Sequence, residues 1–290
     1  VNTDPTKCKS TPGRCPFVVK NLLELKNAQR LLLEGNVMEN TWAGFTQHAA
    51  AMVLMATNQG TLTGNTNATV ADITVRYDHI AHTGRGFSIA DTQGTWGPAK
   101  MAARFSIHDD VFDDISPAYA NGDTSVVIGS AFQLSICGLC TPLDGVEINH
   151  VTMLFQSPTF FMILGGSTSA SIQNVKFTNN IVTAKSGLVV TGTGSPAPCG
   201  FYGATVLARI QSCVSSYSFS RNVLPGATGA WPAGNYYPVD TTSIQFADYS
   251  GGKGGDYHLL PSSPYKSAGS DGKDLGADID AINQEIAGIY

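Results

Sequence analysis

The chain has 290 residues, of which only 13% are charged and 31 are glycine, and its formal net charge is −5. It has no cluster of Lys and Arg, which excludes nucleic acid as an expected partner, because binding phosphates requires concentrated positive charge. No apolar run approaches the roughly 18 residues of a membrane-spanning helix, so no membrane span is expected. Few charges and many glycines favour short strands and turns over amphipathic helices.

The first segment, residues 1–16, is predicted to be a loop stapled by a disulfide, since three prolines lie around two cysteines there. All six cysteines fall into close pairs, and although six cysteines allow fifteen connectivities, each close pair encloses a short loop. The predicted disulfides are Cys8–Cys15, Cys137–Cys140 and Cys199–Cys213. For the middle pair, a redox dithiol and half of a metal site are the alternatives. Neither the helix of a redox motif nor a second ligand pair follows it.

Several features predict an exported protein, located outside the cell or at its surface. Disulfides persist in oxidising compartments. Asn67 begins an N-glycosylation sequon in a loop rich in Gly, Asn and Thr. The chain begins with Val1 and carries no signal peptide, so we expect a processed form or a segment of a longer protein.

A short phrase recurs six times along the chain. Each copy alternates apolar and polar residues with the period of a β-strand, then has a bend residue, then another apolar residue. The copies are residues 31–38, 73–80, 105–112, 146–153, 175–182 and 217–224. Five copies have Asn or Asp at the bend, namely Asn36, Asp78, Asp110, Asn180 and Asn222. The fourth copy has Val151 there, with Asn149 two residues earlier.

Copies at such intervals indicate a solenoid, in which each unit buries its apolar face only by stacking on its neighbours. A strand, a bend and a second strand form the unit of a parallel β-helix, so we predict an all-β fold of this kind. The Asn and Asp side chains are expected to hydrogen-bond backbone groups at the bends and to form a ladder along the axis. The coils are assigned to residues 17–224, with insertions projecting as loops.

Three stretches fit other structures. Leu22, Leu23 and Leu25 have helical spacing, and residues 46–55 are the best short-helix alternative in the chain. Residues 225–290 are assigned to an irregular C-terminal wrap of the same domain, because they begin with a segment rich in Pro, Gly and Tyr. Within the wrap, isoleucines at helical spacing predict a short helix over residues 278–286.

Three phrases carry a family resemblance: VKNLLELKNAQRLLLEGNVMENTW, DITVRYDHIAHTGRGFSIA and DYHLLPSSPYKSAGSDGKDLGADID. They resemble bacterial right-handed parallel β-helix repeat proteins of the pectate-lyase-like superfamily. The resemblance covers nearly all of the chain, most specifically residues 18–115 and 254–280. It implies a right-handed β-helix that contacts extracellular polysaccharide. Members of this kind are usually longer at the N-terminus, so we expect further coils to be missing from this chain.

Whether the chain is an enzyme is left open by its motifs. Hydrolases on this fold carry Asn-Thr-Asp, Asp-Asp and Gly-His-Gly phrases, and lyases an Arg-x-Pro-x-x-Arg phrase; this chain has neither set complete. Two carboxylates held about 5 to 10 Å apart can act as acid and base in glycoside hydrolysis. The catalytic candidates are therefore Asp109, Asp110 and Asp114 with His108, although Asp110 is more simply a bend residue.

A second group of residues has the chemistry to hold a sugar. Arginine grips the carboxylate of an acidic sugar with two hydrogen bonds, and an exposed aromatic ring stacks on a sugar ring. The substrate-binding candidates are His79, His82, Arg85, Arg104 and Trp96. The alternative for the polar residues is that they are solvated strand-edge residues, and the alternative for Trp96 is that it caps the apolar interior of the coils.

No metal site and no cofactor are predicted; calcium is compatible with the fold, but no residue pattern indicates it. The expected partner is a polysaccharide, with the chain as a binder or a divergent lyase or glycoside hydrolase. The competing hypothesis is structural. An uncovered end coil has unpaired strand edges, through which copies of the chain could assemble into a surface layer or filament without catalysis.

Overall fold

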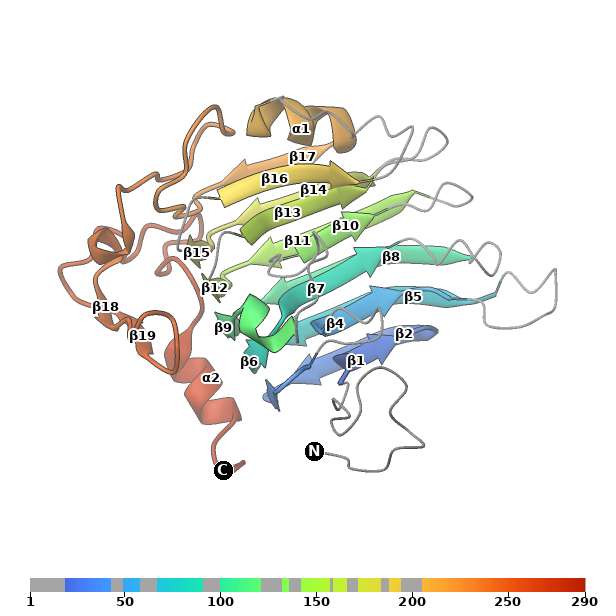
Figure 1. The fold of residues 1–290 in the computed structure, drawn as a ribbon, viewed down its shortest axis with the longest axis horizontal. Coiled ribbons are helices and arrows are strands. Elements are labelled where there is room, and N and C mark those ends of the chain that lie inside the picture. Colours follow the sequence, from blue (N-terminus) through green and yellow to red (C-terminus); the bar gives the residue numbers. More distant parts are fainter. Residues whose placement is uncertain are drawn as a thin grey trace, which may run out of the picture.

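The computed structural model describes residues 19–42, 49–57, 67–90, 100–120, 132–135, 142–156, 159–165, 172–183, 188–193 and 205–289. The predicted N-terminal loop, residues 1–16, lies outside them. The described chain is mostly β-strand, and long parallel sheets form its body (Figure 1).

Three parallel sheets are visited by the chain in turn, so that neighbouring strands of a sheet are three apart in sequence. The first sheet contains β1 (Asn21–Leu25), β4 (Ala50–Met55), β7 (Arg85–Ala90), β10 (Phe132–Ser135), β13 (Thr159–Gly165) and β16 (Leu188–Thr193). The second contains β2 (Ala28–Glu34), β5 (Thr69–Arg76), β8 (Met101–His108), β11 (Leu143–Asn149), β14 (Ile172–Thr178) and β17 (Tyr217–Ser220). The third contains β3 (Val37–Glu39), β6 (His79–Thr83), β9 (Val111–Ile115), β12 (Thr152–Phe155) and β15 (Ile181–Thr183). This order is compatible with the predicted β-helix.

The predicted alignment of the six copies is confirmed by the strand register. The first residues of the copies pair across the second sheet as Leu31, Ile73, Phe105, Val146, Val175 and Tyr217. Each copy supplies a strand of the second sheet, and the bend leads the chain towards the third sheet. The two stretches with helical spacing near the N-terminus instead supply β1 and β4, because their apolar residues pair with neighbouring strands of the first sheet.

The predicted ladder of bend residues is present in two runs. Asn36 N donates to Asp78 Oδ1 at 2.6 Å, and Asp78 N donates to Asp110 Oδ1 at 2.9 Å. A second run joins Val151 N to Asn180 Oδ1 at 2.8 Å and Asn180 N to Asn222 Oδ1 at 3.0 Å. Because Val151 has no polar side chain, no side-chain rung joins the runs among the described residues.

The residue before each bend position, rather than the bend residue itself, takes the left-handed conformation. These residues are Gly35, Tyr77, Asp109, His150, Asn179, Arg221 and Gly234, with φ between 51° and 83°. A β-branched residue would be strained at such a φ, and none of the seven is β-branched. The last of them precedes Asn235, which adds a sixth rung at a seventh bend position: Asn222 N donates to Asn235 Oδ1 at 3.0 Å.

Aromatic rings form a stack inside the three sheets. Phe87 and Phe132 are stacked with centroids 5.5 Å apart, and Phe177 and Phe219 are stacked at 4.9 Å. Beyond Phe219, Trp231 lies at 6.1 Å and closes this end of the stack together with α1 (Val206–Cys213), a helix that the sequence pattern did not predict (Figure 1). The register thus places large apolar side chains over one another from coil to coil.

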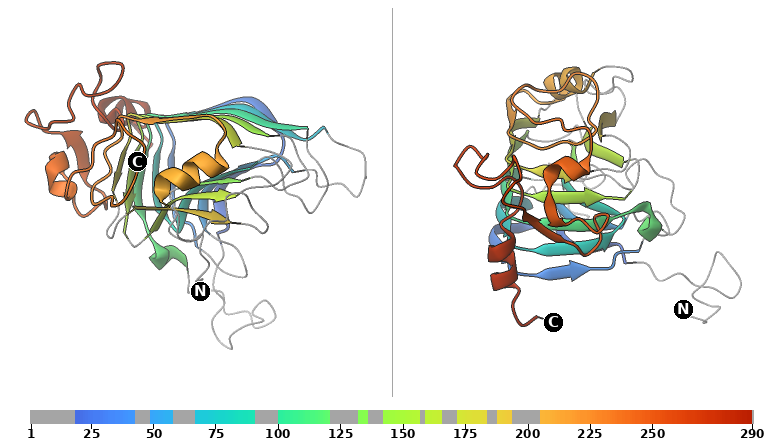
Figure 2. Two further views of the ribbon diagram at one scale, coloured as in Figure 1. Left: turned by 90° about the horizontal axis from the view of Figure 1, so that it is seen from above. Right: turned by 90° about the vertical axis from the view of Figure 1, so that its left-hand side faces the viewer.

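The C-terminal segment, residues 236–286, covers the outward face of the third sheet (Figure 2). Val111 and Ile181 from that face pack with Tyr257 and Leu275 in a second hydrophobic cluster. Gly276 approaches the sheet so closely that a Cβ would lie 2.6 Å from Thr152 Oγ1. The segment also contains η3 (Thr241–Ile244), the antiparallel pair β18 (Phe246–Asp248) and β19 (Asp256–Leu259), and α2 (Ile279–Glu285). Helix α2 confirms the short helix predicted near the C-terminus.

Neither α-helix in the described part of the chain has the length and apolar character needed to cross a membrane.

Candidate functional site

The outward face of the second sheet is polar along its length. One row of side chains runs in register across all six strands: Leu32, Thr74, Ser106, Glu147, Lys176 and Ser218. A parallel row consists of Glu34, Arg76, His108, Asn149, Thr178 and Ser220. Neighbouring strands lie about 4.8 Å apart, so, apart from the exposed Leu32 at one end, each row repeats a polar group at short, regular intervals along the stack.

A third row lies within these strands, one residue before the first residue of each copy, and it contains a gap. Arg30, Asp72, Arg104, Gly145 and Asn174 follow one another across the sheet, all with φ between 54° and 75°. Gly145 alone among them has no side chain, and a groove lies there. The groove is lined by Arg104, Phe105, Ser106, Asp144, Gly145, Val146, Glu147, Asn174 and Lys176.

Ion pairs and hydrogen bonds hold the charged groups of this face. Arg104 donates from Nε to Asp72 Oδ1 at 2.6 Å and from Nη2 to Asp72 Oδ2 at 2.8 Å, and its side chain is 55% exposed. These hydrogen bonds from Arg104 lower the pKa of Asp72. Across the groove, Asn174 Nδ2 donates to Asp144 Oδ1 at 2.7 Å. Arg104 is thus a substrate-binding candidate that the structure places at a groove.

The structure divides the four predicted catalytic residues among three environments. Asp110 is fully buried in the ladder of bend residues, which agrees with its interpretation as a bend residue. Burial together with the charge of Asp78 raises the pKa of Asp110 well above the ordinary value. His108 and Asp109 meet each other, with His108 Nδ1 2.8 Å from Asp109 Oδ2. Asp114 lies at the far end of β9. Alternation along the strand and the bend separate residues that are adjacent in sequence.

Asp114 belongs to a cluster between the third sheet and the C-terminal segment. Tyr119 Oη, from η2 (Pro117–Ala120), donates to Asp114 Oδ2 at 2.5 Å. Lys253 Nζ lies 3.2 Å from Asp114 Oδ1, and His82 Nε2 lies 3.8 Å from Oδ2. The structure therefore brings together one predicted catalytic residue and one predicted binding residue.

The other histidine of that group, His79, faces Asp113, with Nε2 3.7 Å from Asp113 Oδ2. Tyr257 Oη donates to Asp113 Oδ1 at 2.8 Å, and Gly254 N donates to Oδ2 at 2.6 Å. Burial alone would raise the pKa of Asp113, but the nearby His79 and the hydrogen bonds from Gly254 and Tyr257 outweigh it and lower the pKa. All these partners of Asp113 are protein groups, so its role here is to fasten the C-terminal segment.

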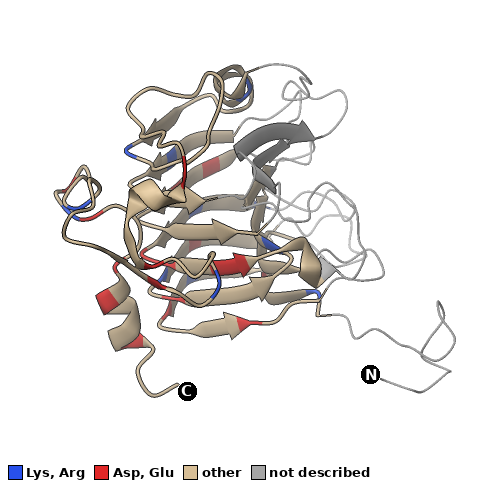
Figure 3. Ribbon diagram, turned by 60° about the vertical axis from the view of Figure 1, so that its left-hand side comes forward, with Lys and Arg blue, Asp and Glu red and all other residues tan. Residues whose placement is uncertain are grey.

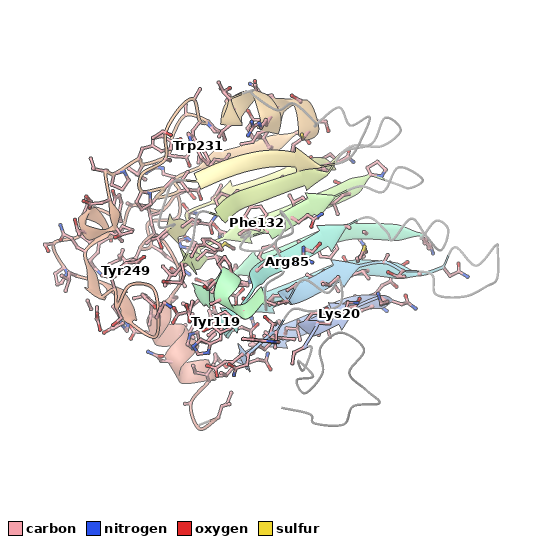
Figure 4. The ribbon with its side chains drawn as sticks, in the orientation of Figure 1. Lys20, Arg85, Tyr119, Phe132, Trp231 and Tyr249 are labelled. Atoms are coloured by element: carbon pink, nitrogen blue, oxygen red, sulfur yellow. The ribbon has the colours of Figure 1, made fainter. Side chains whose placement is uncertain are left out.

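Among the remaining binding candidates, Arg85 lies on the first sheet and not at the groove. Arg85 begins β7 of the first sheet, only 8% exposed, and its Nη1 donates to Gln133 Oε1 at 3.2 Å (Figure 4). Burial makes Arg85 a poor ligand for a polymer. Trp96 lies outside the described residues. Asn67 is exposed, as a glycosylated asparagine must be, and its glycosylation stays a prediction.

The predicted disulfides also stay predictions. Cys213 is described and is buried at the end of α1. Its predicted partner Cys199 and the other four cysteines lie outside the described residues.

Sequence reasoning missed most of the groove. Gly145, Asn174 and Lys176 line it, and Asp72 pairs with Arg104 at its edge. These residues lie in or just before three different copies, and the strand register makes them neighbours. Extending the alignment of the copies a few residues upstream would have placed them in common rows. Among the described residues, no group of three or more His, Cys, Asp or Glu could hold a metal ion.

Fold and site together define a mostly-β protein of long parallel sheets with one exposed, grooved polar face. No protein-family model matches the chain, and no curated protein matches it either.

Proposed function

We propose that the chain is an extracellular, right-handed parallel β-helix protein of the pectate-lyase-like kind that binds polysaccharide on the outward face of its second sheet. The groove at Gly145, between Arg104 and Asn174, is the observation that carries this proposal. A polymer lying along the rows would meet hydroxyl, amide and charged groups from coil after coil. Such repetition suits a chain of similar sugar units.

Binding is favoured over catalysis at this groove. A glycoside hydrolase needs one carboxyl group that stays protonated to act as the acid. Here Asp144 accepts a hydrogen bond from Asn174, and Glu147 lies 3.5 Å from Lys176 Nζ. Each carboxylate is thus already held by a donor group of the protein itself. The groove therefore resembles a contact surface more than an acid–base pair.

Filling the groove tests the proposal. Asn tolerates positive φ better than most residues, and a Cβ at Gly145 would meet no atom closer than 3.5 Å. Gly145→Asn should therefore fold and place a side chain where the polymer would lie. We expect its affinity for a polysaccharide identified on a glycan array to fall about tenfold, or roughly 1.4 kcal/mol, in isothermal titration.

Gly229→Asn is the matched control, since Gly229 has φ 87° and a Cβ there would have no atom within 4 Å. It should bind like the unaltered chain. Equal affinity of both variants would rule out the groove at Gly145 as the binding site.

The structural alternative is supported by one end of the stack only. β1, β2 and β3 are the outermost strands of their sheets, and apolar residues of β1 such as Leu22 and Leu23 are only half-buried. The opposite end is closed by α1 and Trp231. Assembly through the strand edges would then join two copies rather than build a filament. Under this alternative, light scattering across a hundredfold dilution shows a dimer dissociating, and a constant monomer mass contradicts it.

A further inference from the structure

The charges on the outward face of the second sheet balance within the face itself. Its strands present four cationic side chains, Arg30, Arg76, Arg104 and Lys176, and four anionic ones, Glu34, Asp72, Asp144 and Glu147. In the ribbon of Figure 3, acidic and basic positions are interspersed over the described part of the chain. We propose that the polysaccharide bound at this face is a neutral, hydroxyl-rich polymer rather than a uronate or an amino-sugar polymer. This inference rests on the proposed function.

Arg104 is one of the two cations that line the groove, with Lys176, and its donors are already directed to the protein. Nε and Nη2 bond both oxygens of Asp72 at 2.6 and 2.8 Å, and Nη1 lies 3.6 Å from Met101 Sδ. A uronate carboxylate would have to displace Asp72, exchanging one bidentate pair for another with little net gain. Arg30, the neighbour of Asp72 on its other side, adds to the positive field that holds Asp72 ionised.

Two further pairs of charged groups on the face are matched in the same way. Arg76 pairs with Glu34, and its guanidinium carbon lies 5.4 Å from the ring centroid of Tyr77. Lys176 lies opposite Glu147 on the neighbouring strand. An amino-sugar polymer would in turn have to compete with Arg76 for Glu34 and with Lys176 for Glu147. Neither kind of charged polymer therefore finds a cation or an anion held in excess for it.

Neutral hydroxyl groups fit what the face still offers. Thr74, Ser106 and Ser218 present hydroxyls in one row. A carboxylate that accepts one or two bonds retains acceptor sites, because its two oxygens provide about four lone-pair positions. Sugar hydroxyls donate and accept at once, so they can add to these ion pairs without breaking them.

The test compares three soluble probes: a neutral glucan, polygalacturonate and chitosan. Each is titrated into the unaltered chain by calorimetry in low and in high NaCl. We expect only the glucan to bind, with an affinity that changes less than about twofold with salt, since no ions are released on binding. Tighter, salt-sensitive binding of polygalacturonate or chitosan overturns the neutral class but leaves polysaccharide binding standing. No binding to any of the three overturns the inference and counts against the proposed function itself.

A gain of function provides the second arm. Asp72→Asn keeps a residue suited to φ 57° but removes the carboxylate that holds Arg104. We expect it to bind polygalacturonate at least about tenfold more tightly than the unaltered chain does in low salt. The double variant Asp72→Asn with Arg104→Gln, which has the net charge of the unaltered chain, should lose that gain. If Asp72→Asn binds the uronate polymer no better than the unaltered chain does, pairing within the face is not what excludes it.

Discussion

Replacing Asn222 with Ala is expected to lower the free energy of unfolding by about 3 to 5 kcal/mol. The side chain is fully buried in the ladder. Its Oδ1 accepts from Asn180 N and Nδ2, both at 3.0 Å, and its Nδ2 donates to the carbonyl of Phe177 and to Asn235 Oδ1, both at 2.8 Å. Alanine would leave several of these groups buried without a partner, and each buried group without a partner costs about 1 to 3 kcal/mol.

Urea unfolding followed by circular dichroism measures this change, with Asn149→Ala as the control. Asn149 is the same residue type at the end of β11, and its Oδ1 accepts from Thr178 and Asn179. Its side chain is only partly buried, so water can replace it and the expected cost is about 1 kcal/mol. A loss for Asn222→Ala no larger than that of the control would show that the ladder is not a source of stability.

The ladder shows how far the sequence carries a prediction. Its rungs were predictable because a period of two followed by Asn or Asp recurs, and stacked strands must then superpose the bend residues. The break was also visible, since Val151 stands where the other copies have a polar residue. The sixth rung, Asn235, was not predictable, because it follows a Pro- and Gly-rich stretch with no strand pattern. Asn235 is held in position because the next residue, Tyr236, forms a parallel β-bridge with Val223 of the preceding coil.

Predicting the groove required knowing which residues of neighbouring strands lie side by side. Arg104 was identified from its chemistry alone, but the gap beside it exists because Gly145 occupies the same row. Glycine is common in this sequence, so its presence at one position carries little signal. The acids from Asp109 to Asp114 show the opposite case, in which residues close in sequence are separated in the fold. Proximity in sequence suggested one site, whereas the bend sends Asp110 inward into the ladder and leaves Asp109 beside His108.

Two rungs of the ladder are aspartates, and they predict a pH-dependent stability. Asp78 and Asp110 are both buried, and in each the Oδ2 atom has no hydrogen-bond partner among the described residues. Burial raises the pKa of Asp78, and burial together with the charge of Asp78 raises the pKa of Asp110 further. A protonated Asp110 can donate from Oδ2 as an Asn side chain does, and by its place in the register we expect Val75 O to accept.

The sign of the effect follows from these raised pKa values. In the unfolded chain Asp110 loses its proton at the ordinary aspartate pKa of about 3.9. In the folded chain it keeps the proton to higher pH. The contribution to stability is therefore fully present below the unfolded pKa and is lost as pH rises towards the folded pKa. Asparagine has the same shape and never ionises, so it avoids this loss.

Asp110→Asn is accordingly expected to raise the free energy of unfolding by about 1 to 3 kcal/mol at neutral pH and by much less near pH 4. Urea unfolding of both chains across this range measures the difference. The control is Asp72→Asn, whose carboxyl has a lowered pKa because of Arg104, so its removal should stabilise at no pH. A gain for Asp110→Asn that is the same at both ends of the range would mean that ionisation of the rung is not its source. A loss at neutral pH would show that the charged carboxylate itself is required at this bend.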